Sequence, residues 1–344
     1  MYTIEDYLFY YKDITLKEVH FNQMDSLLFA ILVYLPIDSF KDKKNLNNFI
    51  DYSLKYTKYL NKGAMSKIAF KLLEIIKESK RYKNLIISNF VNIENEYTQY
   101  GACKINIEDN TIISYKGTNS SLIGWIENLR LGYEYPTYTQ NIAIKYLKES
   151  INFNDKKIYV TGHSKGGNLA LASAFEVNNS ILKRIIKIYN FDGPGFLKEE
   201  YHSEKYNRIK NKIINIIPTG SIVGVILNNE KYTVVKSNDY AVNEHYPNSW
   251  CIFGEKFIEA DLSTISIKLH ENTTLGLESL EREKVKKAIE TIIDNLKFND
   301  KNNFNLNDLI NIIKNMKTID KDVQKYILKI INTLINNKEI NNVK

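Results

Sequence analysis

The amino-acid sequence predicts an α/β protein in which a mostly parallel sheet is covered by helices on both faces. Helical spacing of apolar residues alternates with short β-rich runs between residues 138 and 220. One strand-to-helix passage, residues 158–175, carries a serine between glycines, and amphipathic helical patterns flank the region on both sides. Alternating strands and helices are typical of parallel crossover units, whose sheet is buried on both faces.

The N-terminal part of the chain is predicted to be helical. Residues 24–80 place apolar side chains three and four positions apart, the pattern of amphipathic helices. The run "SLLFAILVYLPI" at 26–37 is too short to span a bilayer and fits a buried helix. The first residues include acidic side chains and no apolar core of a secretion signal, and the two cysteines, Cys103 and Cys251, lie far apart. We therefore expect a reduced, cytoplasmic setting.

Strand patterns begin near residue 97. Residues 97–107 and 110–117 are β-rich runs separated by a turn-like trio, which predicts a hairpin. Beyond them the pattern predicts a helix over 140–151, a strand over 156–162, a helix over 166–177, and strands over 184–195 and 211–220.

Helical periodicity returns near the C-terminus, over residues 277–296, 305–316 and 322–337, with the polar linker "KFNDKNNFN" after the first of these segments. We expect residues 1–275 to form one domain, whose first 90 or so residues are a helical segment. Residues 276–344 are expected to form a C-terminal helical extension packed on that domain.

The charge of the chain points to few partners. Lys and Arg number 47 against 40 Asp and Glu, a formal net charge of +7 that is spread along the sequence. We therefore expect no nucleic-acid partner. The basic helix "REKVKKAIETI" at 282–292 leaves peripheral membrane contact open, although such a run is usually a solvated helix face. The oligomeric state stays open.

The stretch "VTGHSKGGNLA" at 160–170 has the pattern of a nucleophile elbow, G-x-S-x-G between a strand and a helix. Gly162 and Gly166 would let the strand and helix backbones approach closely around a strained turn. Ser164 would project from that turn. The main-chain N–H of Lys165, at the N-terminus of the helix, would then be placed to donate to an oxyanion.

Four stretches together resemble a bacterial family of largely uncharacterised α/β-hydrolase proteins related to the class 3 (fungal-type) lipases. They are "YKGTNSSLIGWIENL" at 115–129, the elbow, "NFDGPGF" at 190–196 and "HYPNSW" at 245–250. The resemblance implies an α/β-hydrolase fold and hydrolysis of an ester, small or lipid-like, through an acyl-serine, without metal or organic cofactor. It also implies that Thr118 supplies the second oxyanion donor. Lys116 stands where the family has arginine.

A serine nucleophile needs an imidazole base, and the chain offers five histidines: His20, His163, His202, His245 and His270. His163 neighbours Ser164 on the elbow, where adjacent side chains diverge, so packing is its expected role. His20 precedes the sheet. His245 fits the order nucleophile, acid, histidine that hydrolases of this fold follow, and we predict it as the base. His202 and His270 remain alternatives.

The sequence offers more than one candidate for the acid of the triad. The resemblance would place an aspartate after the strand "NKIINIIP", but Ser221 stands there. Asp192, which closes the preceding strand, is the first candidate, with a turn-capping role as its alternative. Asp239 and Glu244 stay open. A catalytically inactive scaffold that binds a partner is the alternative to a serine ester hydrolase.

Overall fold

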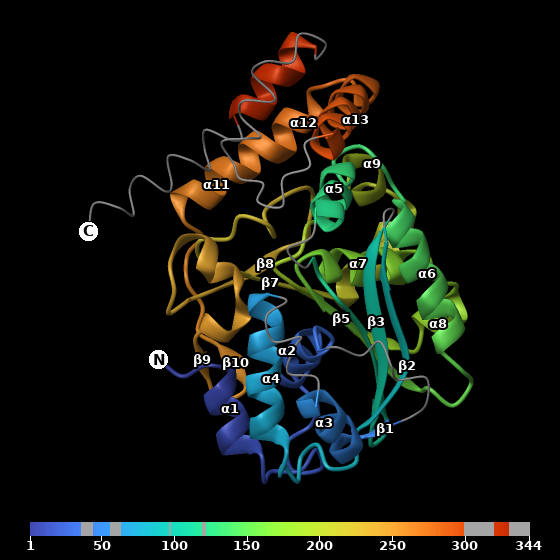
Figure 1. The fold of residues 1–344 in the computed structure, drawn as a ribbon, viewed down its shortest axis with the longest axis vertical. Coiled ribbons are helices and arrows are strands. Elements are labelled where there is room, and N and C mark those ends of the chain that lie inside the picture. The colour runs from blue at the N-terminus through green and yellow to red at the C-terminus, as the bar shows by residue number, and fades with distance from the viewer. Residues whose placement is uncertain (36–43, 56–62, 96–97, 119–121, 299–319, 330–344) are drawn as a thin grey trace.

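The computed structural model describes residues 1–35, 44–55, 63–95, 98–118, 122–298 and 320–329. Within these residues eight strands form one sheet whose spatial order follows the sequence from β1 to β8. The first four strands pair antiparallel and β4 to β8 pair parallel (Figure 1). The strands are β1 (Lys44–Asn45), β2 (Ile86–Glu94), β3 (Gln99–Ile107), β4 (Asn110–Tyr115), β5 (Lys157–His163), β6 (Ile185–Phe191), β7 (Ile213–Pro218) and β8 (Tyr232–Val235).

The antiparallel edge of the sheet contains one confirmed and one unexpected feature. β3 and β4 form the predicted hairpin. β2, which pairs with β3, falls partly in the segment that the sequence assigned to helix, and that assignment is wrong for residues 86–90. Its register shifts between Ser88 and Val91, where Asn89 has a φ of 52°. This bulge breaks the alternation of apolar and polar residues by which a strand is recognised.

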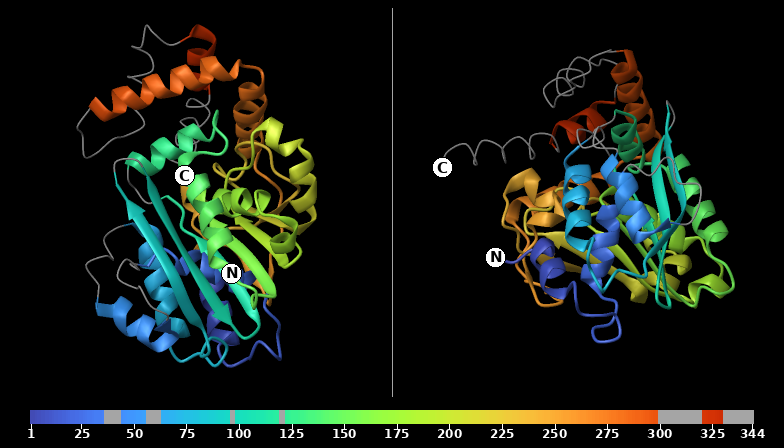
Figure 2. Two further views of the ribbon diagram at one scale, coloured as in Figure 1. Left: turned by 90° about the vertical axis from the view of Figure 1, so that its right-hand side faces the viewer. Right: turned by 60° about the horizontal axis from the view of Figure 1, so that its bottom comes forward.

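One face of the sheet is covered by the crossover helices. These are α6 (Tyr138–Ser150), α7 (Lys165–Phe175) and α10 (Glu204–Ile209), which pack with the strands around one hydrophobic cluster. Right-handed crossovers between consecutive neighbouring strands all return over the same side of a sheet. The consecutive strand order therefore gathers these helices on one face and leaves the other face to different elements (Figure 2).

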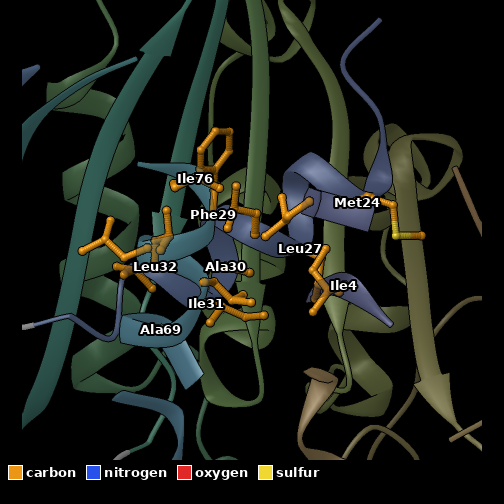
Figure 3. Close-up of a cluster of buried hydrophobic side chains, with 14 of the residues drawn as sticks. Ile4, Met24, Leu27, Phe29, Ala30, Ile31, Leu32, Ala69 and Ile76 are labelled. Carbon is orange, nitrogen blue, oxygen red and sulfur yellow. The ribbon is translucent and has the colours of Figure 1, made fainter. Parts of the chain in front are cut away.

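The N-terminal helices cover that second face. They are α1 (Ile4–Tyr11), α2 (Gln23–Leu32) and α4 (Ala64–Ile76). Every residue of α2 from Met24 to Leu32 is buried, as a helix surrounded by protein must be. Figure 3 shows its side chains meeting Ile4, Ala69 and Ile76 from the neighbouring helices. The predicted buried helix is thus confirmed for residues 26–32, whereas residues 36 and 37 lie outside the described residues. The helix packs directly on β5.

Further helices and a small hairpin, β9 (Ile252–Phe253) with β10 (Lys256–Phe257), complete the described structure. The helices are α3 (Leu46–Lys55), α5 (Leu122–Arg130), α8 (Asn179–Leu182), α9 (Lys198–Tyr201), α11 (Thr264–His270), α12 (Gly276–Glu278) and α13 (Arg282–Phe298). Two 3-10 turns, η3 (Ala241–His245) and η4 (Pro247–Ser249), follow β8.

The C-terminal helices lie together at one end of the molecule (Figure 1). α13 packs Val285 and Ile289 against Ile126 of α5. Residues 321–329 are helical, whereas the predicted helix at 305–316 and most of the linker fall outside the described residues. The boundary at residue 275 stays a prediction. No helix in the described ranges is both long and apolar enough to cross a membrane.

The mostly parallel sheet, helices on both faces and a strand-to-helix turn at Ser164 confirm the α/β-hydrolase fold.

A buried ion pair stabilises the packing of the N-terminal helices. Asp25 of α2 accepts hydrogen bonds from both Nε and Nη2 of Arg81, at 2.8 and 2.7 Å, and from the Tyr82 hydroxyl at 2.6 Å. The Arg81 and Asp25 side chains are both fully buried, so removing one charge would leave the other buried without a counter-ion.

We predict that Asp25→Asn lowers the free energy of unfolding by about 3–5 kcal/mol, because it leaves the Arg81 guanidinium buried without its counter-ion. Urea unfolding at neutral pH measures this. The matched control is Asp13→Asn, which breaks the exposed Lys80–Asp13 pair at 3.5 Å and should cost less than about 1 kcal/mol. Equal losses in the two variants would contradict the prediction.

Candidate active site

Ser164 occupies the sharp turn between β5 and α7. Its φ of 59° and ψ of −132° are unusual for a residue with a side chain. The turn is held by main-chain hydrogen bonds, from Ser164 N–H to the Phe191 carbonyl and from Gly167 N–H to the Ser164 carbonyl, both 2.9 Å long. A Cβ on Gly162 would lie 2.2 Å from the Gly166 carbonyl, which confirms the predicted close approach of strand and helix.

Asp192 and His245 meet beside this turn. His245 ends η3, and its Nδ1 lies 2.6 Å from Asp192 Oδ2. Because a carboxylate only accepts, Nδ1 is the donor in this contact. In the tautomer that this contact fixes, Nε2 is the nitrogen that can accept a proton. Asp192 is fully buried at the end of β6, and its Oδ1 accepts from Gly224 N–H at 3.0 Å and from the Ser221 hydroxyl.

The other positions considered for the acid make different contacts. Ser221 occupies the position where the lipase pattern has an aspartate, and its hydroxyl donates to Asp192 instead. Glu244 accepts from Gly220 N–H at 2.8 Å, and burial raises the pKa of its carboxyl. Asp239 is exposed. Of the acids left open by the sequence, the structure joins Asp192 to His245.

The remaining histidines are also accounted for. His20 and His202 are exposed, and His270 Nδ1 lies 2.7 Å from the Val225 carbonyl. His163 is buried, and its Nε2–H donates to the His245 carbonyl at 2.8 Å. The two rings lie 4.6 Å apart between centroids. His163, the residue before Ser164, therefore holds the main chain of His245 beside the elbow. No local sequence pattern predicts this contact.

The environment of His163 keeps its ring neutral. Burial lowers the pKa of His163 well below its usual value, and the nearby His245 lowers it further. The Nε2–H points at a carbonyl, so Nδ1 is the acceptor, 3.3 Å from the hydroxyl of Tyr34. Tyr34 follows α2, so the N-terminal layer also supports the elbow.

The two expected oxyanion donors lie close to Ser164 in the fold. Lys165 is the first residue of α7. A Cβ on Gly117 would lie 3.2 Å from Ser164 Cβ, so the main chain that leads into Thr118 passes directly beside Ser164. The Thr118 hydroxyl accepts from Asn128 Nδ2 at 3.1 Å. Lys116 reaches toward Asn92 Oδ1, at 3.4 Å.

Ser164 itself is nearly buried, with 8 % of its surface exposed. Among the residues that the structure describes, its hydroxyl makes no hydrogen bond to a histidine ring. Nucleophile and base in unliganded enzymes are often further apart than a hydrogen bond and draw together around substrate.

Comparison with known proteins identifies the family. A crystal structure of M37 lipase is similar, at 18% identity and a TM-score of 0.36 over 58% of this chain and 68% of that one. No curated protein matches the chain. The model of the Mbeg1-like family matches residues 76–294, which include Ser164, Asp192 and His245. The chain therefore belongs to the Mbeg1-like family, a lipase-related family.

Proposed function

We propose that this protein is a serine hydrolase that transfers the acyl group of a carboxylic ester to water, with Ser164, His245 and Asp192 as its triad. The observation that carries the proposal is the hydrogen bond of 2.6 Å between His245 Nδ1 and Asp192 Oδ2, beside the strained turn that presents Ser164. A buried carboxylate on Nδ1 fixes the tautomer that leaves Nε2 able to accept a proton.

The reaction would proceed in two halves. Ser164 Oγ attacks the ester carbonyl carbon while its proton moves to His245 Nε2, and the resulting imidazolium protonates the departing alkoxide. Water then attacks the carbonyl carbon of the acyl-serine while His245 Nε2 takes its proton. As the bond from that carbon to Ser164 Oγ breaks, His245 gives the proton to Oγ, which releases the carboxylic acid and the free serine. Asp192 stabilises the imidazolium in both halves. The hydrogen bonds from Gly224 and Ser221 to its other oxygen offset the cost of burying its charge.

The main-chain N–H groups of Thr118 and Lys165 would hold the oxyanion. Support comes from the passage of Gly117 beside Ser164 Cβ and from the place of Lys165 at the start of α7. Each such donor contributes about 2.7–4 kcal/mol to lowering the barrier in well-studied hydrolases.

The substrate class follows from chemistry and fold rather than from a bound ligand. An ester requires less protonation of its leaving group than an amide, which favours an ester, small or lipid-like. The two cysteines are free and buried, which agrees with the reduced, cytoplasmic setting that we propose.

The competing function is an inactive scaffold, favoured by Ser221 in the place of the lipase aspartate. Asp192 weakens that objection, because it puts a carboxylate on His245 from the neighbouring strand.

Two separate assays test the proposal: covalent labelling by a fluorophosphonate probe, and hydrolysis of p-nitrophenyl butyrate by the unlabelled protein. We expect wild type to be labelled and Ser164→Ala to lose both labelling and hydrolysis. Asp192→Asn should lower kcat by about 10⁴-fold, since the imidazole loses its tautomer control. Asp239→Asn, an exposed acid near the same loop, should behave as wild type. A folded wild type that never reacts would favour the scaffold instead.

The pH dependence of stability should reveal the neutral His163. Below about pH 6.5 His163 binds a proton in the unfolded chain but stays neutral in the folded chain. The free energy of unfolding therefore falls as the pH falls. The contribution is about 1.4 kcal/mol per pH unit.

We therefore expect His163→Gln to lose less stability than wild type between pH 7.5 and 5.5, as measured by urea unfolding. His202→Gln, which alters an exposed ring, should keep the wild-type dependence. Parallel curves for wild type and His163→Gln would show that His163 has the same pKa in the folded and unfolded states, which would contradict the prediction.

A further inference from the structure

The side chain of Lys165 lies in a second polar cluster, behind the elbow. Its Nζ lies 2.7 Å from Glu127 Oε2 of α5, and the exposed fractions of the two side chains are only 2% and 6%. We infer that this buried ion pair positions the two oxyanion donors relative to each other. The inference rests on the proposed function, because it assigns Lys165 and Glu127 as positioning residues for that site.

The ammonium of Lys165 is fully engaged. Besides Glu127, it donates to the main-chain carbonyl of Gln99 at 2.5 Å and to the Gln99 side-chain oxygen at 3.3 Å. These contacts use all three of its N–H groups. Burial lowers the pKa of Lys165, and the Glu127 carboxylate opposes that shift. Glu127 also accepts from the hydroxyls of Thr98 and Thr139.

Two short paths lead from this cluster to the segment that carries Thr118. In the first, Gln99 Nε2 donates to the carbonyl of Gly117, the residue before Thr118, at 3.4 Å. In the second, the neighbour of Glu127 on α5, Asn128, donates to the Thr118 hydroxyl at 3.1 Å. The side chain of Lys165, whose main-chain N–H is one proposed oxyanion donor, is thus linked through Gln99 and through Glu127 to the segment of Thr118, which offers the other donor.

A stabilising role alone does not account for the pair. Replacing a buried ion pair with neutral side chains of similar size is often neutral or favourable for stability. An oxyanion site has a stricter need, because its donors must lie within a fraction of an ångström of the developing charge. Directional contacts of an ammonium with fixed carbonyl and carboxylate oxygens meet that need better than apolar packing does.

The chain offers a matched control pair. Lys104 and Asp155 are also buried and 2.7 Å apart, with 6% of each side chain exposed. Asp155 precedes β5, so this pair lies at the amino end of the strand whose carboxyl end carries Ser164. The two double variants Lys165→Met/Glu127→Gln and Lys104→Met/Asp155→Asn both remove one buried pair while keeping every main-chain N–H.

The experiment compares kcat, KM and the inhibition constant of a trifluoromethyl ketone, whose serine adduct presents an oxyanion. In Lys165→Met/Glu127→Gln we expect kcat to fall 10- to 100-fold, KM to change less than threefold, and the inhibition constant to rise in step with the loss of kcat. The control double variant should keep both kcat and the inhibition constant within threefold of wild type.

Three outcomes of this comparison overturn the inference. An active wild type with an unchanged Lys165→Met/Glu127→Gln variant overturns it alone, as do equal losses in the control variant. A folded wild type that neither hydrolyses esters nor binds the ketone overturns the proposed function and the inference together. If Lys165→Met/Glu127→Gln does not fold, Gln99→Met/Asn128→Ala decides, since it cuts both side-chain contacts to the segment that carries Thr118. Weaker ketone binding in that variant supports the inference, and unchanged binding overturns it.

Discussion

The rest of the site depends on one constraint, the left-handed main-chain turn at Ser164. A residue with a side chain in such a conformation costs about 1–3 kcal/mol, which the surrounding structure must offset. The turn persists because the backbones of β5, α7 and β6 contact one another directly, through Gly162, Gly166 and the Phe191 carbonyl. Those contacts fix where the serine points. They also bring the end of β6, and with it Asp192, to the same edge of the sheet.

That shared edge explains how Asp192, on the strand before the one after which the lipase pattern has its aspartate, reaches His245. The carboxyl ends of parallel strands meet at one edge, so a carboxylate on either of two neighbouring strands can reach the same imidazole. In this chain the hydroxyl of Ser221 supports Asp192 from the strand that lacks the acid. The loop that carries His245 is in turn fixed from two sides, by His163 at the His245 carbonyl and by Trp250 Nε1 at the Glu244 carbonyl, 2.7 Å away.

The features that could be predicted from the sequence are those with a local pattern. The elbow, the β3–β4 hairpin and the buried helix α2 each have a spacing or a composition of their own. The choice of Asp192 over Asp239 and Glu244 depends on how a loop folds back across the sheet, which no periodicity encodes. The pairing of Lys165 with Glu127 joins residues 38 positions apart and was missed for the same reason. β2 was missed because its bulge erases the alternation that marks a strand.

The most direct measurement is a crystal structure of the protein after reaction with diethyl p-nitrophenyl phosphate, a tetrahedral mimic of the acylation step. The account predicts phosphorus bonded to Ser164 Oγ, with its free oxygen about 3 Å from the main-chain nitrogens of Thr118 and Lys165. It also predicts His245 Nε2 within hydrogen-bond reach of Ser164 Oγ, with Nδ1 still on Asp192. A phosphoryl oxygen that points away from both amides, or an adduct on another residue, would contradict it.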